Sequence, residues 1–268
     1  MGAFLLVLTL MGYLGTAILS VAQLYDMKRA KWAKGLAWLG FLAETVWLIL
    51  QAGRGPVTLS QWVAFFVWMA VGLYLTLSQR LGLMPMGAFL LPTTFAIWAL
   101  GMAVSNGARV DNAAHSGFWV PAHWFLSALA DVCFLLTAVF AIMYIEKERE
   151  LKSKEVELFY YRLPALDAMD GWMARLLAAG WAIDTLALVT ASLTLHSILH
   201  SGPVWSVPPW GSVVMWMIYG FLLSTRLVGR WRGRRLARGC MLAFLGVLIV
   251  VFGINLTSLG GRHLVPAL

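Results

Sequence analysis

The amino-acid sequence predicts an all-α, polytopic integral membrane protein with eight transmembrane helices and both termini outside. Of its 268 residues, 61% are hydrophobic and only 12% are charged, whereas a soluble domain has about 25% charged residues. Apolar runs of roughly 20 residues, the length that crosses a bilayer, recur along the whole chain. Lysine and arginine gather in every second loop, and this pattern indicates the direction of each crossing.

The apolar runs divide the chain into eight spans within a single membrane domain, residues 1–268. Their approximate ranges are 2–24, 35–52, 60–77, 84–104, 119–145, 171–195, 210–227 and 239–259. No cationic region precedes the first run, which is long for a signal-peptide core, so we expect it to be retained as a span. Pro121 lies in the first turn of the fifth span, where proline is tolerated in a helix.

The basic residues predict the orientation of these spans. Seventeen of the 20 Lys and Arg residues lie in the odd-numbered loops or at the span ends beside them, and only Arg54, Arg109 and Arg262 lie on the other side. Cytoplasmic loops carry the excess of Lys and Arg, so both termini are expected outside. The net charge of +8 is then a topology signal and an attraction to anionic lipid, and no nucleic acid is expected as a partner.

The fifth span organises the prediction, because it joins a histidine at one membrane surface to a charged run at the other. Between Trp124 and Met143 its only ionisable side chains are Asp131 and the thiol of Cys133. The run EKERELKSK that follows alternates in charge and predicts a solvated helical extension. The next segment, LFYYRLPALDAMD, is amphipathic, and we expect it to lie along the membrane surface.

All five histidines are predicted to lie on or just inside the outer face. They are His115, His123, His196, His200 and His263. Imidazole is the commonest metal ligand and a common axial ligand of heme iron, so two histidines at the mouths of different helices could clamp a flat cofactor. For each histidine the alternative is an interfacial polar residue bound to water.

Three carboxyl groups, those of Glu44, Asp131 and Asp184, fall within predicted spans. Ionisable groups inside a membrane are costly and are often functional, so a transport pathway is one hypothesis. The other is structural: hydrogen bonds to Ser, Thr or Asn on neighbouring spans, since no cation lies at comparable depth. Cys133 and Cys240 lie at different depths, so no disulfide is expected.

Several segments resemble the cytochrome c assembly superfamily, which includes CcsA, ResC and the HemX proteins of heme synthesis. They are AHWFLSALADVCFLLTAVFAIMYIEKERELKSK, RLPALDAMD, WMIYGFLLSTRLVGRWRGRRLAR and GINL, which together cover most of Trp119 to Leu256. The first hundred residues resemble the family more loosely, through GFLAETVWLILQAGRGP. The order and spacing of the segments carry the resemblance, rather than any single motif.

The resemblance implies a non-covalent, b-type heme held at the outer face. His123 corresponds to the first external heme ligand of the family and His263 to the second, with His196 and His200 in reserve. Four tryptophans would line the porphyrin pocket: Trp119, Trp124, Trp205 and Trp210. The family's inner histidine pair is replaced by Glu44 and Ser224, and its Trp-rich segment is reduced to HSILHSGPVWSVPPWG.

These departures place the chain nearest the HemX-like branch. The first functional hypothesis is a heme-handling protein of the bacterial cytoplasmic membrane that acts in cytochrome c biogenesis, with a ResB-like subunit and apocytochrome c as implied partners. The alternative is a HemX-like regulator of the abundance of glutamyl-tRNA reductase. The sequence contains no nucleotide motif, zinc motif or nucleophile–base pair, so at most it predicts a non-catalytic or degenerate relative of a heme-attachment system.

Overall fold

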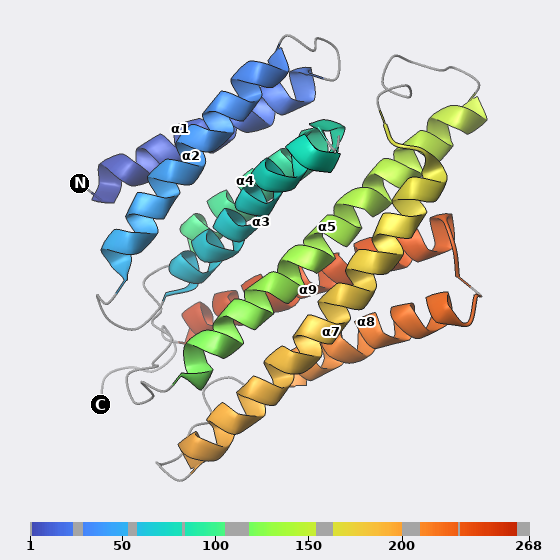
Figure 1. Cartoon of the computed structure of the whole chain (residues 1–268). Helices are drawn as coiled ribbons and strands as arrows, with labels where there is room; N and C mark the ends of the chain where they lie inside the picture. Colours follow the sequence, from blue (N-terminus) through green and yellow to red (C-terminus); the bar gives the residue numbers. More distant parts are fainter. Residues whose placement is uncertain are drawn as a thin grey trace.

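The computed structural model is a bundle of antiparallel helices, drawn in Figure 1. It describes residues 2–23, 29–52, 58–81, 84–104, 118–153, 163–199, 210–229 and 231–261. The helices within these ranges are α1 (Gly2–Ala22), α2 (Arg29–Gln51), α3 (Leu59–Leu81), η1 (Met84–Met86), α4 (Gly87–Val104), α5 (Trp119–Ser153), α7 (Leu166–Leu199), α8 (Trp210–Leu227) and α9 (Arg234–Gly261). The prediction of an all-α, polytopic membrane protein is confirmed.

Each of the eight predicted spans corresponds to one long helix in the described part of the chain. Seven of these helices are long and apolar enough to cross a membrane, and α8 is a shorter apolar helix whose apolar part is Gly211–Leu227. Consecutive helices run in opposite directions (Figure 1), so the bundle has two distinct ends. We call the end that holds the start of α5 the histidine end, and the end that holds the turn between α8 and α9 the arginine end.

The long helix α5 lies between two groups of helices (Figure 1). On one side α3 and α4 pack against it, with α1 and α2 beyond them. On the other side α7 packs along much of its length, and α9 packs against it as well, while α8 contacts α7 and α9. Its middle is buried by these neighbours, with the side chains of Val132, Leu135, Phe140 and Met143 at most 1% exposed.

Five helices extend beyond the predicted spans at the arginine end: α2, α3, α5, α7 and α9. The helix α5 continues through the charged run to Ser153, which confirms the predicted extension. The helix α9 begins at Arg234, five residues before the predicted start. Basic and acidic side chains can reach water from the last turns of a helix, so the helical backbone does not stop where the apolar run stops.

The expectation that LFYYRLPALDAMD lies on the membrane surface is wrong for its described part. The residues from Leu166 onward form the first turns of α7, and the side chains of Leu163 and Met169 are buried. The ammonium group of Lys147 on α5 donates hydrogen bonds to the backbone carbonyls of Leu163 (2.9 Å) and Pro164 (2.8 Å). These contacts hold the chain against α5 where it enters α7.

Asp170 joins three helices at the arginine end. Arg226 of α8 donates a hydrogen bond of 2.6 Å to Oδ2 of Asp170 on α7, and the backbone N–H of Gly233, just before α9, donates one of 2.9 Å to Oδ1. Gly233 has a φ of +57°, which favours glycine. Two of the segments that carry the family resemblance, RLPALDAMD and RLVGRWRGRRLAR, therefore meet at this contact.

Replacing Asp170 with Asn should lower the free energy of unfolding by about 2 kcal/mol, because hydrogen bonds to charged groups contribute roughly that much. Thermal unfolding of the purified protein in detergent measures the change. Asp167→Asn is the matched control, since Asp167 is exposed on the same turn and forms no ion pair within the described residues. An equal loss of stability in both variants would contradict this assignment.

Candidate functional site

His123 lies one turn into α5 at the histidine end and faces α7. Its ring nitrogen Nδ1 is 2.8 Å from the backbone carbonyl oxygen of Ala187 on α7. The hydroxyl of Ser127, one turn deeper on α5, lies 3.4 Å from the same nitrogen. The carbonyl of Ala187 also accepts a hydrogen bond of 2.8 Å from the hydroxyl of Thr190. The ring of His123 is therefore held in place by the packing of α5 against α7.

This contact determines which nitrogen of His123 is available to a ligand. A carbonyl oxygen can only accept a hydrogen bond, so Nδ1 must carry the proton. In the neutral ring the lone pair then lies on Nε2, and no described residue forms a hydrogen bond with that atom. Metal-binding histidines commonly donate their second N–H to a backbone carbonyl in this way, because the contact fixes the tautomer and the ring orientation. The geometry fits an axial ligand of heme iron.

Two predicted pocket tryptophans lie beside His123 on α5. Trp119 is the first residue of the helix and is 48% exposed, while Trp124 is half-buried. Residues four apart share a helical face, so Trp119 lies one turn above His123 toward the membrane surface. An exposed indole on the same helical face as an available imidazole nitrogen fits a flat aromatic ligand.

Of the other predicted site residues, two belong to described helices that end or begin at the histidine end. His196 is in the last turns of α7, and Trp210 is the first residue of α8; their side chains are not among those described. His200, Trp205 and His263 lie outside the described residues. The structure thus places His123, Trp119 and Trp124 in the first turns of α5, with Trp119 on the same face as His123, and the roles of all the predicted site residues stay predictions. Among the side chains described, no group of three or more His, Cys, Asp or Glu residues could hold a metal ion.

The two positions that replace the family's inner histidine pair lie apart in this structure. Glu44 is on α2, which packs against α1 and α3, whereas Ser224 is on α8, which packs against α7 and α9. The two helices lie on opposite sides of the bundle (Figure 1). The Ser224 hydroxyl donates to the carbonyl of Phe221 within its own helix. These two residues therefore do not form a site together.

Glu44 instead takes part in a buried contact between α1, α2 and α4. Its carboxyl group is 1% exposed and accepts a hydrogen bond from the hydroxyl of Tyr13 on α1. Trp98 of α4 packs edge-on against the Tyr13 ring, with 6.4 Å between ring centroids. The structural hypothesis is therefore correct for Glu44, although its partner is a tyrosine rather than Ser, Thr or Asn.

Replacing Glu44 with Leu should lower the free energy of unfolding by about 1–3 kcal/mol, because the buried hydroxyl of Tyr13 would lose its acceptor. Glu44→Gln keeps an acceptor oxygen and should change stability by less than about 1 kcal/mol. Thermal unfolding in detergent compares the two variants. If the Leu variant were as stable as the Gln variant, the hydrogen bond between Tyr13 and Glu44 would make no measurable contribution to stability.

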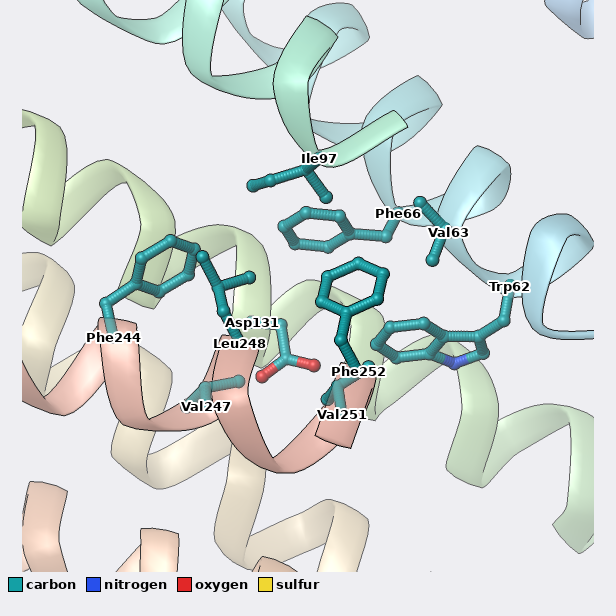
Figure 2. A pocket seen from close by; sticks show the side chains of 10 residues that line it. All are labelled: Trp62, Val63, Phe66, Ile97, Asp131, Phe244, Val247, Leu248, Val251 and Phe252. Atoms are coloured by element: carbon teal, nitrogen blue, oxygen red, sulfur yellow. The ribbon is translucent and has the colours of Figure 1, made fainter. Parts of the chain in front are cut away.

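Asp131 lines a pocket between α3, α4, α5 and α9 whose other lining residues are all apolar. Figure 2 shows these side chains around its carboxyl group: Trp62, Val63, Phe66, Ile97, Phe244, Val247, Leu248, Val251 and Phe252. Asp184 of α7 lies close enough to act on Asp131 electrostatically. Neither carboxyl group forms an ion pair within the described residues. The described residues around Asp131 therefore provide no cation or polar pathway that would support the transport hypothesis.

Comparison with known proteins decides the family. The sequence profile described as "Cytochrome C assembly protein" matches residues 57–260, which is most of the chain. The chain belongs to this family. The match covers α3 to α9, including His123 and the contacts around Asp170.

Individual relatives match a shorter part of the chain. The cytochrome c biogenesis protein CcsA of Oryza sativa is 27% identical over 116 residues, which is 42% of this chain and 36% of the relative. The CcsA protein of Agrostis stolonifera is 28% identical over the same length, and that of Citrus sinensis is 29% identical over 112 residues, 38% of this chain and 32% of the relative. The chain therefore matches about a third of the length of these relatives. No solved structure matches.

These findings confirm the predicted superfamily, and the relatives named above are all CcsA proteins. The placement in the HemX-like branch remains a prediction. The sequence predicts His123 as a ligand through the family resemblance. It could not indicate Ala187, because a backbone carbonyl leaves no trace in residue type and its position depends on how α5 and α7 are aligned.

Proposed function

We propose that this member of the cytochrome c assembly family holds heme at the histidine end of the bundle and acts in cytochrome c maturation. The observation that carries the proposal is the hydrogen bond from Nδ1 of His123 to the carbonyl of Ala187, which leaves Nε2 available to iron. The family match to residues 57–260 supports the same role.

In the proposed site His123 and His263 would hold the heme iron, with His196 and His200 as the alternatives to His263. Trp119, Trp124, Trp205 and Trp210 form the walls that contact the porphyrin. The heme is b-type, held by ligation and packing without a covalent bond. When bound, it supplies the group that is to be attached to an apocytochrome, while the protein orients the iron through His123 and excludes water with the indoles.

We place the histidine end on the outer face of a bacterial cytoplasmic membrane. The opposite end carries the arginines of the turn between α8 and α9 together with Arg149, Lys152 and Lys31. Cytoplasmic ends carry the excess of basic residues, which supports this orientation and puts both termini outside. A ResB-like subunit and apocytochrome c are the proposed partners at the outer face, because heme would be presented there.

Deletion of the gene tests the role. Cells that lack the protein should lose most of the heme covalently attached to c-type cytochromes, as measured by heme staining of denatured proteins, while b-type cytochromes are retained. Complementation with the wild-type gene should restore the staining, and complementation with His123→Ala should not. If c-type cytochromes were unchanged and the abundance of glutamyl-tRNA reductase shifted instead, the proposal would be wrong and the HemX-like alternative correct.

A further inference from the structure

The turn between α8 and α9 contains a group of basic residues that differs in kind from the other basic segments. From Arg226 to Arg238 the chain carries six arginines and no lysine, whereas the basic run before α2 (28–34) contains three lysines and one arginine. Topology rules treat lysine and arginine alike. Guanidinium groups differ in that they bind a phosphate group through two parallel hydrogen bonds. The use of arginine without lysine therefore fits a phosphate-binding role better than a role in setting membrane orientation alone.

Three of these arginines are available to a ligand. Arg226 is engaged by Asp170, and Arg234 lies 3.5 Å from a carboxyl oxygen of Glu148. Arg232, Arg235 and Arg238 are exposed and form no ion pair within the described part of the chain. They are three residues apart in sequence, and residues three apart in a helix lie on one face, so Arg235 and Arg238 point the same way on α9.

The turn that carries them is fixed in place rather than free. Asp170 holds Arg226 and the backbone of Gly233 through hydrogen bonds of 2.6 and 2.9 Å. Trp231, next to Arg232, packs edge-on against Phe221 of α8 at a centroid distance of 6.0 Å. Because the turn is already ordered, less conformational freedom is lost there when a ligand binds to the neighbouring guanidinium groups.

The residues around the arginines indicate the depth of the turn in the membrane. Leu227 and Val228 are 77% and 70% exposed, so their apolar side chains are free to contact lipid. Tryptophan is enriched at the level of the lipid headgroups, where Trp231 would lie. The exposed leucine and valine would reach the acyl chains, while the arginines stay level with the phosphates.

We propose that the turn between α8 and α9 is a binding site for the phosphate headgroup of anionic phospholipids, with Arg232, Arg235 and Arg238 as its ligands. This inference does not depend on the proposed role in heme handling. A lipid is favoured over a soluble phosphate compound because the same turn also carries two exposed apolar side chains, Leu227 and Val228.

The test measures lipid binding to the purified full-length protein by native mass spectrometry, with phosphatidylglycerol and phosphatidylcholine added in equal amounts. The wild-type protein should retain phosphatidylglycerol preferentially. The triple variant R232Q/R235Q/R238Q should bind it about tenfold more weakly, because it loses the three guanidinium groups that bind the phosphate. The variant R232K/R235K/R238K keeps the charge but loses bidentate binding, and should bind about threefold more weakly.

The control K31Q/K34Q/R149Q removes three cations from the same end of the bundle and should leave binding unchanged. Thermal unfolding and circular dichroism establish that every variant is folded. If the control lost as much lipid binding as the glutamine variant, or if the lysine variant lost none, positive charge alone would explain the binding. Either result would overturn the proposal. Displacement of the lipid by millimolar inorganic phosphate, or preferential retention of RNA added in its place, would also overturn it.

Discussion

Replacing His123 with Ala should lower the affinity for hemin by at least about 100-fold, because the change removes an axial ligand. Partners that only orient a metal ligand are commonly worth about 10–100-fold in affinity, and the ligand itself should be worth more. Titration of the detergent-purified protein with hemin, followed by quenching of tryptophan fluorescence, measures the affinity. Free imidazole, added to fill the space left by the side chain, should restore part of the binding.

Ser127→Ala is the matched control for His123→Ala. The Ser127 hydroxyl lies near the same ring nitrogen, at 3.4 Å, but the hydrogen bond to Ala187 remains when the hydroxyl is removed. The variant should bind hemin within about threefold of the wild-type protein. Unchanged affinity in the His123→Ala protein would show that heme, if bound, is held elsewhere.

Replacing Gly180 with Val should have the largest effect on stability, since α5 and α7 approach closely at this residue. A Cβ atom at Gly180 would lie 2.7 Å from a ring carbon of Phe134 and 3.0 Å from Cβ of Cys133. The Phe134 ring has no room to move, because it is 2% exposed and stacks on Tyr219 at a centroid distance of 3.6 Å. Overpacking of this kind costs about 1–3 kcal/mol and occasionally more.

The same substitution should also weaken hemin binding about tenfold, because helices that are forced apart at Gly180 cannot keep His123 against Ala187 two turns away. Thermal unfolding and hemin titration measure the two effects. Gly171→Val is the matched control on the same helix, where an added Cβ meets nothing within 4 Å. If the Gly180 variant lost stability and still bound hemin normally, then the position of His123 would not depend on this packing.

The sequence predicted the fold well because membrane spans depend on local composition. Each predicted span corresponds to one helix, since the length of an apolar run is set by the thickness of the bilayer. The errors lie at the arginine end, where α9 begins at Arg234 and α7 at Leu166. A run of charged residues marks where the chain leaves the apolar layer, but it does not end a helix whose backbone hydrogen bonds are still satisfied.

The candidate site was only partly predictable. The family resemblance predicts His123 as a ligand, whereas its contact with Ala187, 64 residues away in sequence, depends on the alignment of α5 and α7. The partner of Glu44 was expected among Ser, Thr and Asn, but it is Tyr13. The ring of a tyrosine packs like an apolar side chain while its hydroxyl forms hydrogen bonds, so residue type alone does not mark Tyr13 as the partner of a carboxyl group within a span.

The most direct test of the heme-ligand assignment is the absorption spectrum of the hemin-reconstituted protein, oxidised and reduced, beside that of His123→Ala. Sharp α and β bands, as given by two axial histidines, are expected in the reduced wild-type protein and should be lost in the variant. A wild-type spectrum without these bands, or the same bands in both proteins, would contradict the assignment of His123 as a heme ligand.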